Sequence, residues 1–247
     1  MALINKLSAI GEAIREKTGK ENLLTLDEMP QAIKDIESGG GDNYYDTFWN
    51  GTLQNGERTD FEHWARGKVF TADSFYPNHD IKPVKATSMF QHSGLNIDLE
   101  QRMLECGKVI DFSKTTSGFD LFQNSAFTVL PVIDCSSANS LQNWFYGSYN
   151  LHTIRLIRVH SGITTYYNAF SVCTVLKEVR FEGEIVASIN FGDCSQLSMD
   201  SVDSIISCLG KYEDGKSRTL KLHKNVKNNL TPEQIATITN DKNWTLA

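Results

Sequence analysis

The chain has 247 residues, of which 40% are hydrophobic and 22% charged, a balance typical of a folded globular protein of one or two domains. Its net charge of −6 argues against nucleic acid as a partner, because a surface that follows phosphates needs a clustered excess of Lys and Arg. No apolar run approaches the roughly 20 residues that cross a bilayer, so we expect no membrane partner either.

Residues 1–37 carry the pattern of two short amphipathic helices. Their apolar positions fall at helical spacing: Ile4, Leu7, Ile10, Ile14, Met29, Ile33 and Ile36. Helices this short depend on tertiary packing. We therefore predict an oligomerisation or attachment module that forms a homo-oligomer such as a trimer, or docks on another protein. The alternative is packing back onto the rest of the chain. The N-terminus lacks the apolar core of a secretory signal, so synthesis and folding in the cytoplasm are expected.

A linker and an aromatic segment follow. Residues 38–43, Ser-Gly-Gly-Gly-Asp-Asn, contain three adjacent glycines that maximise backbone freedom, which predicts a domain boundary. Residues 44–75 are rich in Phe, Tyr and Trp. The ends of a repeat array expose its core unless an atypical unit closes them, so this segment is predicted to be an N-terminal cap.

One short phrase recurs between residues 89 and 197: a Phe, three residues later a Ser or Cys, then a Leu or Phe. The Phe positions are Phe90, Phe122, Phe145, Phe170 and Phe191, at intervals of 32, 23, 25 and 21 residues. Such periods are typical of a solenoid, in which each unit buries its apolar face against its neighbours. The Ser or Cys slot, which includes Cys173 and Cys194, is predicted to be small and buried.

Short β-prone segments precede most of these phrases. They alternate apolar with charged residues and span 109–112, 132–135, 153–156 and 178–181. Stacked unit on unit, such strands would form one parallel sheet. Residues 99–106 have helical character and fall in the long first interval, where we expect a bulge from the regular stack.

The C-terminal residues 198–247 are predicted to close the array. Apolar residues at helical spacing predict a helix over 199–209, and 219–222 alternates as a strand. Thr231 and Pro232 have the character of an N-cap and a first helical residue. Trp244 is expected to cover the last core layer.

The repeated phrase resembles the irregular leucine-rich repeats of bacterial surface proteins and of phage or prophage proteins. The opening AIGEAIREKTG…LTLDEMPQAIKDI, the segment YYDTFWNGTLQNGERTDFEHWARG and the closing NWTLA are similar to phage tail-associated proteins of that kind. The resemblance implies an α/β leucine-rich-repeat solenoid with parallel strands over 44–247. It also implies a place in the virion tail, with other tail proteins as partners of residues 1–37.

No catalytic motif accompanies these repeats. The sequence has no CxxC pair and no HExxH, GxSxG or phosphate-binding glycine loop, so we predict no metal, no cofactor and no enzymatic activity. Asp111 and Asp134 occupy equivalent positions, which would suit a glycosidase pair or a calcium ladder. Later units have Arg155 and Arg180 instead, so solvated strand faces are the preferred interpretation.

Aromatic and basic side chains offer the better lead to a binding surface, because Tyr and Trp supply large, stiff contact areas. The candidate ligand-binding residues are Trp144, Tyr146, Tyr149, Tyr166, Tyr167, Arg155, Arg158 and Arg180. The alternative is that Trp144 and one tyrosine fill the core. The leading hypothesis is a non-catalytic, tail-associated structural and adhesion protein that binds a host-surface glycan or protein. The second is a bacterial protein-interaction module without a virion role, and the third is a glycan hydrolase.

Overall fold

The computed structural model describes residues 60–67, 80–93, 97–213 and 215–247, which belong to one compact unit, Asn55–Ala247. The predicted module at 1–37, the linker at 38–43 and most of the aromatic segment at 44–75 lie outside these residues. So do the oligomerisation residues Ile4, Leu7, Ile10, Ile14, Met29, Ile33 and Ile36. None of the helices described is long and apolar enough to cross a membrane.

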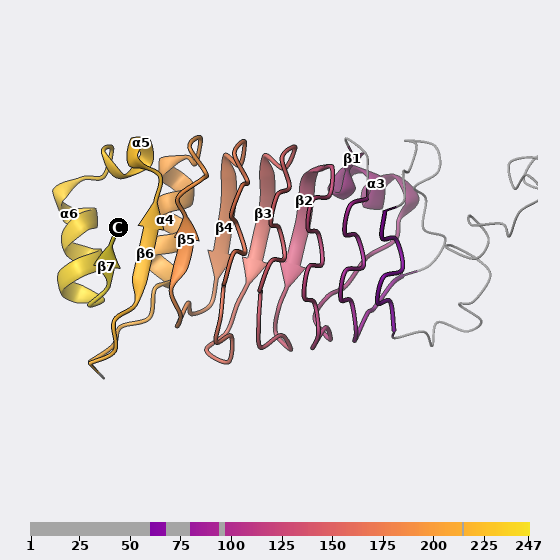
Figure 1. Cartoon of the computed structure of the whole chain (residues 1–247), viewed down its shortest axis with the longest axis horizontal. Coiled ribbons are helices and arrows are strands. Elements are labelled where there is room, and N and C mark those ends of the chain that lie inside the picture. Colours follow the sequence, from indigo (N-terminus) through magenta and orange to yellow (C-terminus); the bar gives the residue numbers. More distant parts are fainter. Residues whose placement is uncertain (1–59, 68–79, 94–96, 214) are drawn as a thin grey trace, which may run out of the picture. The chain divides into compact units, whose positions relative to one another are not determined.

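The described chain is α/β and contains two parallel sheets (Figure 1). The first sheet has the order β1-β2-β3-β4, formed by Ile97–Asp98, Phe127–Asp134, Thr153–Arg158 and Glu178–Glu182. The second has the order β5-β6-β7, formed by Ile189–Phe191, Thr219–Leu222 and Thr245–Leu246. Every pairing is parallel and joins neighbours in chain order. Within each sheet a crossover therefore returns the chain to the same end before the next strand begins.

The predicted strands at 132–135, 153–156 and 178–181 overlap β2, β3 and β4. The strand predicted at 109–112 is wrong: only Ile110 forms an isolated bridge, with Ile81. Its neighbour in the chain is the helix α3, Leu99–Cys106, which confirms the helical character expected there. Asp98 caps α3 by accepting a hydrogen bond from the Gln101 amide at 2.8 Å.

The repeated phrase forms a turn that stacks on copies of itself. Each of five segments, 61–67, 86–92, 118–124, 141–147 and 166–172, contains two residues with positive φ four positions apart. Backbone bonds join the copies: the Phe122 amide donates to the Trp144 carbonyl at 2.7 Å, and the Phe145 amide to that of Ala169 at 3.0 Å. The first copy, 61–67, falls inside the segment predicted as an aromatic cap.

The phenylalanines of the phrase form a buried row, as predicted. Successive ring centroids are 5.4, 5.7, 5.3 and 4.5 Å apart from Phe90 through Phe122, Phe145 and Phe170 to Phe191, with interplanar angles of 5°, 6°, 20° and 24°. All five rings are fully buried. Offset-stacked rings at these separations add about 0.5–1.5 kcal/mol per pair to the burial of their surface.

The Ser or Cys slot is buried and connects one copy to the next. The Ser148 hydroxyl donates to the Phe122 carbonyl at 2.8 Å, and the Cys173 thiol donates to the Phe145 carbonyl at 2.9 Å. Ser93 instead donates to the carbonyl of its own Phe90, at 2.7 Å. The equivalent acceptor for Ser125 is the same Phe90 carbonyl, and the Ser125 hydroxyl has no hydrogen-bond partner.

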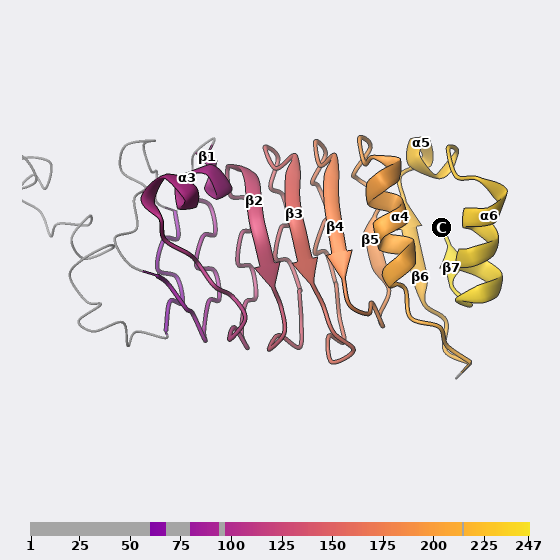
Figure 2. The same ribbon diagram turned by 180° about the vertical axis from the view of Figure 1, so that it is seen from behind.

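Two helices flank the exposed part of the first sheet. In Figure 2, α3 lies beside β2 and α4, Met199–Cys208, lies along β4. α4 occupies the edge where a further strand would pair. The Ser201 hydroxyl accepts the Val179 amide at 3.0 Å, and the Ser204 hydroxyl accepts the Phe181 amide at 2.8 Å. Two side chains thus replace the main-chain acceptors of a missing strand.

The elements predicted over residues 198–247 are present in the structure. α4, the strand β6 and the buried Trp244 are all present. α5, Lys224–Lys227, precedes α6, Pro232–Ala236, which begins with a complete capping box between Thr231 and Gln234. A π-helical turn, Thr237–Asp241, continues α6.

Candidate functional site

The predicted ligand-binding residues do not form one surface. Trp144 and Tyr166 are 0% and 2% exposed, so their assignment to a binding surface is wrong: both fill the core. The reason is visible at Gly118, where a Cβ atom would lie 2.4 Å from the Trp144 ring. Trp144 occupies the space that a larger residue in the preceding turn would need.

The tyrosines that reach solvent lie in two places. Tyr146 is half-buried and Tyr167 is exposed, both on the stacked turns. Tyr149 follows the same turn as Tyr146 but lies beyond it, where the chain approaches the start of β3. It is 57% exposed.

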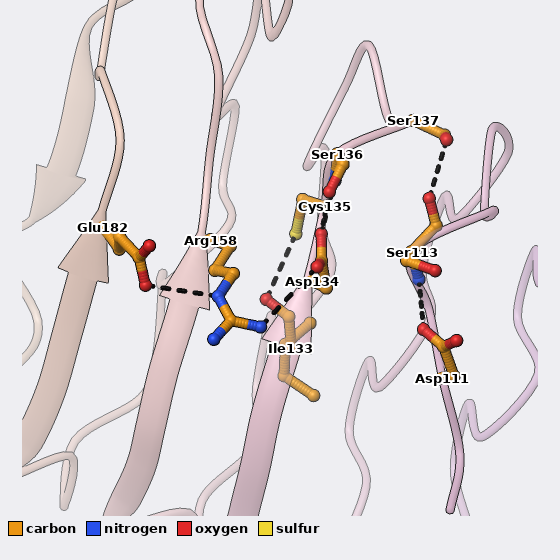
Figure 3. Close-up of polar contacts among 9 residues, drawn as sticks. All are labelled: Asp111, Ser113, Ile133, Asp134, Cys135, Ser136, Ser137, Arg158 and Glu182. Carbon is orange, nitrogen blue, oxygen red and sulfur yellow. Dashed lines mark hydrogen bonds and ion pairs between the residues drawn. The ribbon is translucent and has the colours of Figure 1, made fainter.

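The three predicted arginines lie on the exposed face of the first sheet and are mostly engaged with acids. Arg158 lies between Asp134 and Glu182, with nitrogen–oxygen distances of 3.7 and 3.2 Å (Figure 3). Arg155 forms a 2.6 Å ion pair with Glu100 of α3, and that carboxylate raises the pKa of its guanidinium. Arg180 on β4 is exposed. Such exposed pairs contribute little stability and leave little free charge for a ligand.

The aligned carboxylates are engaged in turn formation. Asp111 accepts the Ser113 amide at 2.9 Å, and Asp134 accepts the Ser136 amide at 2.9 Å. Figure 3 shows these contacts in adjacent turns, where the Ser137 hydroxyl also donates to the Ser113 carbonyl at 2.7 Å. These Asx turns redirect the chain where the extended segments end, which explains why acids recur there. The preferred interpretation placed these two acids on solvated strand faces. The structure adds that each acid also holds a turn.

The buried thiols and one buried carboxyl have perturbed pKa values. Burial raises the pKa of Cys173 to about 12 and also raises the pKa values of Cys135 and Cys194 well above the ordinary value of a thiol, which keeps these thiols protonated and unreactive. Burial also raises the pKa of Asp120, opposed by a hydrogen bond of 2.9 Å from the Asn143 amide. Within the described residues, no group of His, Cys, Asp or Glu could hold a metal ion.

A groove of about 650 Å³ runs along the N-terminal ends of the strands, and we name it the strand-end groove. It is open to solvent and receives residues from four successive repeats. Its lining is Thr128, Tyr149, Asn150, His152, Thr153, Val175, Lys177, Glu178 and Gln196. In Figure 1 these strand ends are the upper ends of β2, β3 and β4.

Main-chain hydrogen bonds fix the order of the groove residues. The His152 amide donates to the Thr128 carbonyl at 3.0 Å, and the Lys177 amide donates to the His152 carbonyl at 3.0 Å. The three side chains therefore occupy the same slot of consecutive repeats. The His152 ring is also held in place, with Nδ1 3.1 Å from the Thr153 hydroxyl.

Tyr149 was predicted from the sequence, but the residues around it were not. His152 and Lys177 each follow the Leu that closes a phrase, and Asn150 and Gln196 each precede that Leu. The sequence feature that could have predicted the groove is the polar residues on either side of the repeated Leu. This feature becomes apparent only when the copies are aligned on Leu instead of Phe.

Comparison with known proteins returned no matching family model, no matching curated protein and no matching solved structure. The conclusions on function therefore depend on the geometry of the chain itself.

Proposed function

We propose that this chain is a non-catalytic adhesion protein of a phage or prophage tail, which binds a host-surface glycan in the strand-end groove. In this proposal the described residues form an irregular leucine-rich-repeat solenoid. Residues 1–37 attach it to other tail proteins or to further copies of itself, and repetition of the site in an oligomer raises avidity. The protein is made in the cytoplasm of the bacterial host and then enters the virion.

The observation that carries the proposal is the composition of the strand-end groove. An exposed aromatic ring, Tyr149, lies among amide, hydroxyl, imidazole, ammonium and carboxylate groups. The flat face of a tyrosine packs against the C–H face of a sugar ring, while the polar groups donate to and accept from its hydroxyls. The groove is open rather than enclosed, which suits a chain that enters from the side.

Two further features support a binding role over a catalytic one. The aligned carboxylates Asp111 and Asp134 each hold a backbone amide, and the buried thiols are protonated. A retaining or inverting glycosidase needs two carboxyl groups that face each other across the substrate. Glu178 is the one carboxylate among the residues that line the groove.

The test compares two tyrosine variants of the full-length protein on a glycan array and on host cells. Tyr149→Ala removes the groove ring, whereas Tyr167→Ala removes a ring of similar exposure, 62% against 57%, outside the groove. We expect Tyr149→Ala to lose most of the binding and Tyr167→Ala to retain it. Equal binding by both variants, or binding of the wild type to cell-surface protein alone, would overturn the glycan proposal.

The virion assignment has its own measurement. Purified particles are labelled with antibody to this chain and viewed by electron microscopy. Label at the tail supports the proposal, and its absence from particles whose host cells contain the protein contradicts it.

A further inference from the structure

The strand-end groove crosses the repeats instead of following one strand. Its residues come from four consecutive repeats, and the hydrogen bonds between Thr128, His152 and Lys177 show that these residues are neighbours in a parallel ladder. Adjacent strands of such a ladder are about 4.7–4.9 Å apart. The groove therefore presents a new set of side chains at each step of that length.

The strand step of about 4.8 Å is close to the length that one sugar ring and its glycosidic oxygen occupy in an extended chain. A linear glycan laid across the strands would thus advance by one ring for each repeat. A chain that curves or coils would lose this match after a ring or two. The Tyr149 ring, in the second of the four repeats, provides the apolar face on which one sugar packs.

The charges of the groove favour an uncharged ligand. The Lys177 ammonium and the Glu178 carboxylate are consecutive in the chain and both line the groove, so their formal charges cancel. Neither forms a salt bridge with another of the described residues. Hydroxyl groups can donate to the carboxylate and accept from the ammonium. A polyanion would also be repelled by the net charge of −6.

We infer that the strand-end groove binds a linear, extended, uncharged oligosaccharide across the strands, with one sugar ring for each repeat. This inference rests on the proposed function and specifies the class of glycan. Four repeats contribute to the groove, so four rings fill it.

The experiment is isothermal titration of the full-length protein with cello-oligosaccharides, which are extended β-1,4-linked chains, of two to six rings. Affinity is expected to rise several-fold with each ring up to four and then to stay constant. Malto-oligosaccharides of equal length, which curve, are expected to bind more weakly. Oligosaccharides of uronic acids serve as the charged control and are expected to bind more weakly as well.

A variant at the far end of the groove locates the fourth ring. Gln196 is exposed and lies two turns beyond Tyr149. Gln196→Ala should lower the affinity for four rings severalfold and leave that for two rings unchanged, whereas Tyr149→Ala should lower both.

The outcomes separate the inference from the proposed function. Affinity that does not change with length, equal binding of curved chains, or tighter binding of acidic chains would refute the inference while glycan binding stands. If no oligosaccharide of any class binds and the glycan array is also negative, both fall together.

Discussion

The helix that closes the first sheet offers the sharpest test of how this fold is held together. Val179 is fully buried, and its amide donates to the Ser201 hydroxyl because no strand pairs with that edge of β4. Ser201→Ala leaves this amide without an acceptor. An unsatisfied buried donor costs about 1–3 kcal/mol. Alanine is the better helix former by about 0.5 kcal/mol, so the net loss is about 0.5–2.5 kcal/mol.

A matched control exists on the same helix. Ser207 is exposed, and its hydroxyl donates to the Ser204 carbonyl within α4 at 2.8 Å without touching the sheet. Ser207→Ala gains the same helix propensity and leaves the β4 amides paired. Ser204→Ala is the independent repeat, since Ser204 accepts the Phe181 amide.

The assay is urea unfolding of the three variants, followed by hydrogen exchange of the Val179 and Phe181 amides. A loss of 1 kcal/mol corresponds to a melting temperature about 2–4 °C lower for a chain of this size. We expect both edge variants to fall below the Ser207 control, with faster exchange at the amide that each one exposes. Edge variants as stable as the control, with unchanged exchange, would show that the serines do not replace a strand.

Four further substitutions test the stacked turns by urea unfolding. Gly118→Ala should destabilise by about 1–3 kcal/mol through overpacking, because its Cβ atom would meet the Trp144 ring at 2.4 Å; no loss would mean that the ring moves freely. Ser148→Ala should cost about 1 kcal/mol and Ser125→Ala nothing, because the Ser148 hydroxyl alone of the two has an acceptor; equal costs would contradict the ladder of side-chain bonds. Val172→Asn should stabilise the protein by about 1 kcal/mol, because a β-branched residue is strained at φ 62° and Asn is not. A destabilised variant would show that the contacts of the Val side chain contribute more stability than the backbone strain costs.

The repeat was predictable from the sequence because its most invariant element is a large side chain at a fixed place. A Phe in every turn from 86–92 to 166–172 leaves a periodic trace, and the parallel strands follow from alternation around Val179. The turn at 61–67 was missed because Ala65 occupies the Phe slot there. The strand at 109–112 was overpredicted because α3 intervenes before it, and alternation alone does not supply a neighbouring strand to pair with.

The candidate site was harder to predict than the fold. Trp144 and Tyr166 look like surface aromatics in a polar stretch, but both are buried. The room for Trp144 is made by Gly118 in the preceding turn, which no local pattern reveals. The groove residues are brought together by register. His152 and Lys177 are 25 positions apart in the chain and become neighbours only when the parallel ladder is formed.

The fit between Gly118 and Trp144 also limits how the array can change over time. The turn at 118–124 is shaped to the turn that follows it, so these two copies are not interchangeable parts. Duplicating or deleting one of them by recombination would bring a bulky residue against a turn without the matching gap. Growth or shortening of this protein would then require compensating substitutions on both sides of the new junction. Side-chain volume thereby constrains the array at this junction, even though the backbone pattern alone would allow any number of repeats.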